Sequence, residues 1–136
     1  MKLIVNAIEE IDYNQFKDWW IFWEFPIIPK DALPNNGFGG LKMTDENGVD
    51  LCAGYLYETN SSIAWIEFIV SNPSVKDRIK RKKAKIELIY YLTLQAEQKG
   101  YKSVFSSIKD KSLINSFLQN NYTESFENTK ELSIKL

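Results

Sequence analysis

The feature that most constrains the fold is an apolar run at residues 63–70 (IAWIEFIV), which only Glu67 interrupts. An apolar run of this length, rich in branched and aromatic residues, is typical of a central strand covered on both faces. Asn72-Pro73 ends the run, and a helical pattern extends from about residue 78 to Lys99. Residues 102–108 (KSVFSSI) predict a further strand. A strand–helix–strand unit forms a right-handed crossover, so we expect these two strands to be parallel neighbours.

The remaining pattern predicts a single α/β domain over residues 1–136. Asp12 is expected to cap the first helix, Asn47-Gly48 to form a hairpin turn, and Gly100 to end the long helix. Further strands are expected at 2–8, 41–44, 49–57 and 131–136, and further helices at 12–25 and 111–120.

The composition indicates the cellular compartment in which the protein is expected. Cys52 is the only cysteine, which excludes an intramolecular disulfide and fits a reducing environment. No apolar run approaches the roughly 18 residues of a membrane span, and the N-terminus lacks the apolar stretch of a signal peptide. We therefore expect a soluble, cytoplasmic protein.

The sequence contains no histidine. Its absence excludes the Ser-His-Asp and Cys-His nucleophile systems and removes the commonest zinc ligand, so no metal site is expected. Acid–base chemistry near neutral pH must then use a carboxylate, a tyrosine, a lysine, the thiol or water.

Charge is distributed unevenly along the chain. Residues 1–75 carry four Lys/Arg against eleven Asp/Glu, whereas residues 76–85 (KDRIKRKKAK) carry seven basic residues and one acid. A cationic cluster on an acidic body indicates one site for an anionic ligand. The alternatives are a solvated helix end, or a patch that binds nucleic acid or an acidic protein. Nucleic acid is disfavoured because the rest of the chain is acidic.

Three segments resemble the GNAT superfamily of N-acetyltransferases: residues 66–78 (IEFIVSNPSVKDR), 97–105 (EQKGYKSVF) and 110–122 (DKSLINSFLQNNY). The resemblance covers about the last 75 residues, and before them only the element order agrees. It implies an α/β (α+β) fold, with a mixed central sheet, splayed parallel central strands and helices on both faces. It also implies acetyl-CoA or another acyl-CoA as cofactor and a small-molecule or protein amine as acceptor.

The sequence departs from the family pattern at two places. The family's phosphate-binding turn contains an arginine or glutamine followed by two glycines. Counting back from Gly100 places Lys80 at the arginine position and Lys83 and Lys85 at the two glycine positions. Counting forward from Pro73 places the turn about four residues earlier, again without glycine. The family's proton-donating tyrosine corresponds to Phe117, which has no proton to donate. These departures bear on catalysis more than on the fold.

The resemblance also assigns the cofactor-binding residues. The pantetheine arm would pair with the strand backbone at Phe68, Ile69, Val70 and Ser71. The diphosphate would bind at the start of the long helix, with help from its cations. The cofactor-binding residues expected there are Lys76, Arg78, Lys80, Arg81, Lys82, Lys83 and Lys85, together with Asp110 at the start of the short helix.

Glu67 is the candidate general base. A buried carboxylate is costly unless its pKa rises or it has a partner, and a raised pKa suits it to deprotonate an ammonium nucleophile. The alternative is a structural carboxylate paired with a lysine or a tyrosine. Tyr122 is the preferred proton donor because it lies near Phe117, which occupies the position of the family's tyrosine. Tyr55, Tyr57 and Cys52 are alternative proton donors.

An aromatic segment corresponds in chain order to the acceptor side of GNAT folds: Trp19, Trp20, Phe22, Trp23 and Phe25. Trp19, Trp23 and Phe25 are the candidate acceptor residues. These residues are expected either to bind the acceptor, since tryptophan faces attract ammonium groups, or simply to pack in the core. Two functions therefore remain open. One is an active N-acetyltransferase, and the other is a GNAT-fold protein without catalysis that binds a partner protein or a nucleotide.

Overall fold

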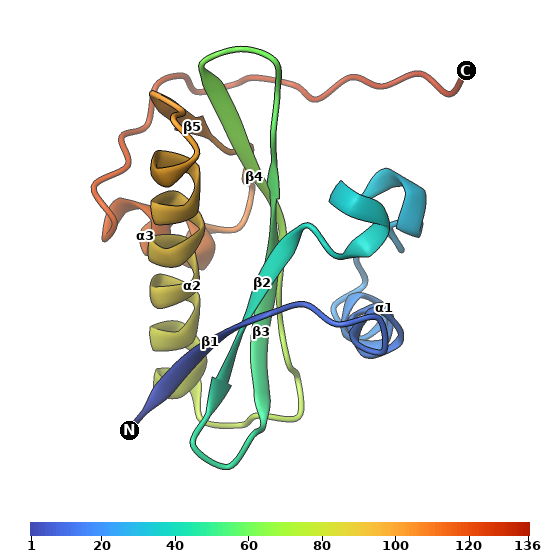
Figure 1. Ribbon diagram of the computed structural model, residues 1–136, viewed down its shortest axis with the longest axis vertical. Helices are drawn as coiled ribbons and strands as arrows, with labels where there is room; N and C mark the ends of the chain where they lie inside the picture. Colours follow the sequence, from blue (N-terminus) through green and yellow to red (C-terminus); the bar gives the residue numbers. More distant parts are fainter.

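The computed structural model describes all 136 residues as one mixed five-stranded sheet with helices on both faces (Figure 1). The strands lie in the order β1-β2-β3-β4-β5, antiparallel except for the parallel β4–β5 pair. They are β1 (Leu3–Ala7), β2 (Gly40–Asp45), β3 (Asp50–Tyr57), β4 (Ile63–Ser71) and β5 (Ser103–Phe105). The helices are α1 (Asp12–Phe22), α2 (Arg78–Gln98) and α3 (Lys111–Leu118), with short 3-10 helices η1 (Lys30–Ala32) and η2 (Pro34–Gly37).

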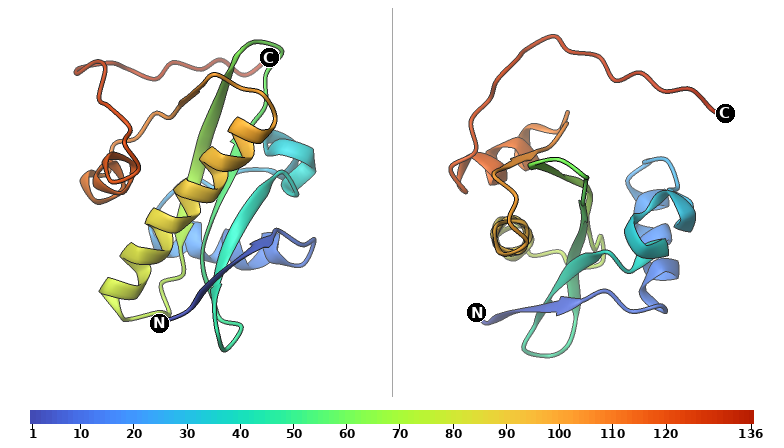
Figure 2. Two further views of the ribbon diagram at one scale, coloured as in Figure 1. Left: turned by 60° about the vertical axis from the view of Figure 1, so that its left-hand side comes forward. Right: turned by 45° about the horizontal axis from the view of Figure 1, so that its top comes forward.

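The helices form two layers with the sheet between them (Figures 1 and 2). On one face, α2 and α3 pack on a core that includes Leu88 and Leu92. On the other face, α1 packs through Phe16 and Trp20 on Tyr55 of β3, and Leu33, between η1 and η2, joins the same core. This arrangement confirms the predicted fold class, the parallel β4–β5 neighbours and the helices on both faces.

Two glycines act as the sequence predicts. Gly48 has a φ of +78° in the β2–β3 turn, and Gly100 has a φ of +91° after α2. An L-residue with a side chain is strained at these angles, whereas glycine is not. After Gly100, the backbone amide of Tyr101 donates a hydrogen bond to the carbonyl of Ala96, and this bond ends the helix.

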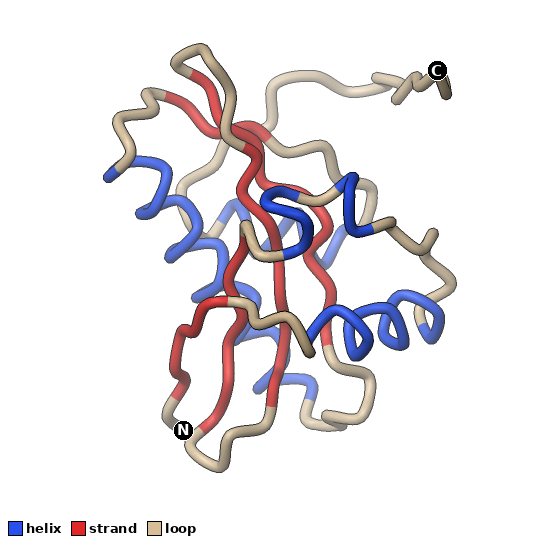
Figure 3. The backbone as a smooth tube through the Cα atoms, turned by 45° about the vertical axis from the view of Figure 1, so that its right-hand side comes forward, coloured by secondary structure: helices blue, strands red, loops and turns tan.

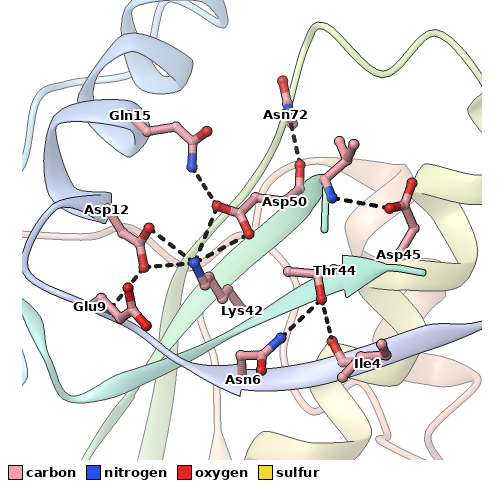
Figure 4. Close-up of polar contacts among 11 residues, drawn as sticks. Ile4, Asn6, Glu9, Asp12, Gln15, Lys42, Thr44, Asp45, Asp50 and Asn72 are labelled. Atoms are coloured by element: carbon pink, nitrogen blue, oxygen red, sulfur yellow. Dashed lines mark hydrogen bonds and ion pairs between the residues drawn. The ribbon is translucent and has the colours of Figure 1, made fainter. Parts of the chain in front are cut away.

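The first helix differs from its predicted bounds at both ends. It begins at Asp12 with Ile11 in the cap position, so the predicted Asp12 cap is wrong. The Asp12 carboxylate instead accepts the amide of Glu9 and the ammonium of Lys42 (Figure 4). The helix ends at Phe22, three residues early, because Glu24 turns into the left-handed region at φ +60° ahead of Pro26.

The central strands separate soon after they meet. Ladder pairing of β4 with β5 covers only Ile63–Trp65, so the strand predicted at 102–108 contracts to Ser103–Phe105. Past this point β4 carries a bulge, where its register against β3 slips by one residue. Phe68, at the bulge, has a φ of +59°. The structure therefore shows the splayed pair that the family resemblance implied.

The strand predicted at 131–136 is absent. These residues form no ladder. They are the last part of the exposed loop that runs from α3 towards the α1 side of the sheet (Figures 2 and 3). The sequence alternates as a strand would, but Leu132 and Ile134 are 91% and 82% exposed. An alternating sequence forms a strand only where another strand pairs with it and a packed layer covers its apolar side chains. No helix of the structure is long and apolar enough to span a membrane.

Candidate active site

A cavity of about 510 Å³ occupies the gap where β4 and β5 separate. Its walls come from β4, from the segment after β5, from α3, and from α1 with the loop that follows it. Most of the lining is apolar: Trp20, Phe25, Pro26, Ile28, Ile66, Phe68, Ile69, Ile108 and Leu113. The polar lining consists of Glu67, Ser106, Ser107, Lys109, Asp110 and Glu131. The gap between the strands is therefore an open, mainly apolar site with a few polar groups.

Glu67 is the carboxylate that β4 brings into this cavity. Its Oε1 accepts the backbone amide of Ser107 at 3.0 Å, and it forms no ion pair. Burial raises the pKa of Glu67, the Ser107 amide opposes the rise, and the nearby Glu131 carboxylate adds to it. The alternative of a structural ion pair with a lysine is therefore not what the structure shows.

Ser107 connects the two carboxylates of the cavity. Its amide donates to Glu67 and its hydroxyl donates to Glu131, a residue of the C-terminal segment. Ser106 also contributes, because its hydroxyl donates to the carbonyl of Ile66 at 2.6 Å. These contacts fix the chain just after β5, where ladder pairing has ended.

The predicted cofactor residues of β4 divide into two groups. Phe68 and Ile69 line the cavity, while Val70 is buried against α1 and Ser71 lies at the strand end. The carbonyl of Ser71 accepts the indole N–H of Trp23 at 2.8 Å. The cavity thus reaches the first half of the predicted backbone stretch.

The cations of residues 76–85 have different surroundings. Lys76 donates to the carbonyl of Pro73, and Arg81 donates to that of Val75. Lys80 pairs with Asp45 at 2.8 Å. Arg78, Lys82 and Lys83 are exposed and form no ion pair.

Among the cations of residues 76–85, Lys85 lies close enough to Asp110, a residue of the cavity lining, for that carboxylate to influence its pKa. It is partly buried without an ion pair, and burial lowers its pKa while the carboxylate of Asp110 opposes the change. The neighbouring charges of Arg81 and Lys82 lower the pKa further. Asp110 caps α3 through the amide of Leu113 and also lines the cavity. A cationic group between α2 and α3 therefore lies beside one end of the cavity.

The start of α2 is capped by the protein itself. Asp77 accepts the amide of Lys80 at 3.1 Å, and α2 is regular from Arg78 onwards. The glycine positions counted back from Gly100 therefore lie inside the first turns of α2. Amides beyond the first turn bond to carbonyls of their own helix, so only the loop before residue 78 and the first turn leave amides for a ligand.

The aromatic residues of α1 are not equally placed. Trp19 is buried in the core between α1 and the sheet, and Trp23 closes over the end of β4. Phe25 lines the cavity, together with Trp20, which the sequence analysis did not select. The apolar pattern of α1 predicts that Trp19 and Trp20 both face inward. Only the tertiary structure shows that Trp20 is the one that lines the cavity.

Tyr122 lies away from Glu67. Its hydroxyl is 2.6 Å from that of Thr93 on α2, and since the Thr93 hydroxyl donates to the carbonyl of Ile89, Tyr122 donates to Thr93. Its ring packs edge-on against Phe117, 4.9 Å between centroids, and burial raises its pKa. Neither Tyr122 nor Phe117 lines the cavity that contains Glu67.

Comparison with solved structures places this geometry in a known fold. The chain is similar to an acetyltransferase from Trypanosoma brucei, with 19% identity over 98% of this chain and all of that one and a TM-score of 0.63. It is similar to the ribosomal-protein-S18-alanine N-acetyltransferase from Escherichia coli, with 13% identity over 92% and 80% of the two chains and a TM-score of 0.69. A Mycobacterium tuberculosis protein solved in complex with CoA gives 14% identity over 96% and 76% and a TM-score of 0.70.

These likenesses define the class by fold: the chain has the GNAT acetyltransferase fold, as the resemblance of its last 75 residues implied. No family model and no curated protein matches the sequence. The fold is therefore shared with these acetyltransferases, whereas the sequence identity to them is low.

Proposed function

We propose that this protein is an acyl-CoA-dependent N-acetyltransferase that transfers an acetyl group to an amine. The observation that carries the proposal is the cavity between the separated β4 and β5, with Glu67 on its wall. The GNAT fold of the chain supports it, as does the CoA in the similar structure from M. tuberculosis. In the proposed arrangement the thioester lies in the gap and the amine approaches Glu67.

In the proposed arrangement the apolar wall of the cavity holds the thioester end of CoA. Phe68, Ile69 and Ile108 offer apolar contacts for a pantetheine arm between the strands. Anionic phosphates would lie towards Lys85 and the exposed Lys82, which have no carboxylate partner within ion-pair distance. Charge-assisted contacts from lysine would then replace part of what a glycine turn offers through its amides.

The proposed reaction is direct attack. Glu67 removes a proton from the acceptor ammonium, and the neutral amine nitrogen attacks the carbonyl carbon of the thioester. The carbon–sulfur bond then breaks, the thiolate takes a proton from water, and the hydroxide left behind takes the second proton from the nitrogen, which gives the neutral amide and free CoA. Because Tyr122 donates to Thr93 outside the cavity, no tyrosine is assigned to the leaving group. The site contributes mainly orientation and a carboxylate whose raised pKa suits proton removal near neutral pH.

The test is Glu67→Gln, which keeps the acceptor oxygen for the Ser107 amide but cannot take a proton. We expect kcat for CoA release to fall by about 10²–10⁴-fold, the usual range for loss of a general base, with acetyl-CoA affinity by calorimetry unchanged. Tyr122→Phe is the matched control and should keep kcat within about threefold. Full activity of the Glu67→Gln protein would remove Glu67 from the mechanism.

A second function is favoured by one observation. The Asp77 carboxylate occupies the start of α2, where the diphosphate is expected, and Lys83 and Lys85 lie within the helix. Under this alternative the protein binds a partner protein or a nucleotide and does not catalyse acetyl transfer. Absence of heat on titration with millimolar acetyl-CoA would favour this alternative over the enzyme.

A further inference from the structure

Three aromatic side chains form a row on the α1 face of the sheet. Trp65 of β4 is the register partner of Tyr57 on β3 and of Phe105 on β5, so the three side chains point to the same side. The rings of Trp65 and Phe105 are 5.4 Å apart between centroids. The row therefore extends across three adjacent strands.

The row is open to solvent beyond the part of the sheet that α1 covers. Trp65 is 38% exposed and Phe105 is 46% exposed, whereas Tyr55, one position further along β3 on this face, is fully buried under α1. Tyr57 is held in place because its hydroxyl donates to the carbonyl of Ala32 at 2.6 Å. Phe68 packs on its ring at 6.1 Å.

Glu67 lies directly beside this row. It is two residues from Trp65 in β4, on the same face, and its charge contributes to raising the pKa of Tyr57 to about 12, after the larger effect of burial. Glu131 lies on the other side of Ser107, so two carboxylates face the region where the row meets the cavity. Neither carboxylate has an ion-pair partner.

We infer that this region selects the acceptor, and that the acceptor is a primary amine on an aromatic body that carries no carboxylate of its own. The inference rests on the proposed acetyltransferase function. The ammonium is attracted by Glu67 and Glu131, while the aromatic body stacks on Trp65 and Phe105. An α-amino acid is disfavoured, because its carboxylate would face two carboxylates of the same sign.

The test uses three amines with the full chain and acetyl-CoA: phenethylamine, phenylalanine, which adds a carboxylate, and butylamine, which lacks the ring. We expect kcat/KM for phenethylamine to exceed that for butylamine by about tenfold, the scale of one aromatic contact. It should also exceed that for phenylalanine, because the carboxylate of phenylalanine would face Glu67 and Glu131. Trp65→Ala should raise KM for phenethylamine by about tenfold, leaving kcat and the rate with butylamine unchanged. Tyr90→Ala, which removes an exposed ring on the outer side of α2, is the matched control.

Direct binding separates this inference from the proposed function. Calorimetry should show phenethylamine binding to the wild-type protein, and binding about tenfold weaker to Trp65→Ala, whether or not acetyl transfer occurs. Glu67→Gln should still bind phenethylamine, but more weakly than the wild type, because Glu131 then attracts the ammonium alone. Equal rates for the three amines, or equal losses for all of them in Trp65→Ala, would overturn the aromatic selection. Acetyl-CoA binding and acetylation of other amines, without any binding of phenethylamine, would overturn it too and would leave the enzyme proposal standing.

Discussion

Lys42 joins α1 to the sheet through a polar cluster between the two layers (Figure 4). Its ammonium lies 3.0 Å from the carboxylate of Asp12 on α1 and 3.2 Å from that of Asp50 on β3, and Gln15 of α1 also donates to Asp50. The side chains of Lys42, Asp12 and Asp50 are 12%, 5% and 13% exposed. Since α1 carries Trp20 on the cavity wall, this cluster also supports the candidate site.

Lys42→Met keeps the aliphatic stem and removes the charge, so it leaves two shielded carboxylates without their cation. Removing one partner of a buried ion pair costs about 3–5 kcal/mol, and we take about 3 kcal/mol here because the cluster retains some contact with solvent. At about 2.1 cal/mol/K per residue, unfolding of a chain of this length has an entropy of about 0.29 kcal/mol/K. The expected fall in Tm is therefore about 10 °C.

The assay is thermal and urea unfolding of the wild type, Lys42→Met, and the triple variant that adds Asp12→Asn and Asp50→Asn. The triple variant removes the uncompensated charges and should recover to within about 1 kcal/mol of the wild type. Burial alone would lower the pKa of Lys42, but hydrogen bonds and charges from the two aspartates raise it above its usual value. The stabilisation is therefore complete below pH 10.5 and is lost as pH rises through the raised pKa. A Lys42→Met protein within 1 kcal/mol of the wild type at pH 7 would refute this reasoning.

Three further outcomes are expected. Gly54→Ala should destabilise the protein by about 1–3 kcal/mol in urea unfolding, because its Cβ would lie 2.8 Å from Ile69 Cγ1; Ser62→Ala, at an exposed loop position, is the control. Cys52 should resist a thiol reagent in native buffer and react fully in denaturant, because burial raises the pKa of this thiol; native labelling within minutes would contradict its burial. Glu67→Gln should be at least as stable as the wild type at pH 8, because a carboxyl whose folded pKa is raised loses stability as pH rises through that value; below about pH 4 the difference should vanish, and a less stable variant at pH 8 would argue against the raised pKa.

The fold could be predicted from local patterns. The apolar run at 63–70, the amphipathic long helix and Gly100 each specify their own conformation, since strand alternation, helical periodicity and a positive φ depend on neighbouring residues alone. The crossover rule then made β4 and β5 parallel. The interruption by Glu67 marked the one carboxylate of this strand, and the structure places it in the cavity.

Other features depended on contacts far apart in the sequence. Asp12 has the residue type of a helix cap, but Lys42, thirty residues away, made it an ion-pair partner. Residues 131–136 have the alternation of a strand, but no strand pairs with them. Ser107 carries no local signal at all, and its role appears only where β5 leaves β4 and its amide meets Glu67.

The sequence by itself therefore determined the three helices, the first five strands and the crossover, apart from their exact ends, because short-range sterics and apolar periodicity fix them. Only the tertiary structure decided which side chains share the cavity: Trp20 and Phe25 do, while Tyr122 is turned away to Thr93. The physical reason is that a site is assembled from groups distant in the chain. Their meeting depends on packing and on where two strands separate, which no single segment encodes.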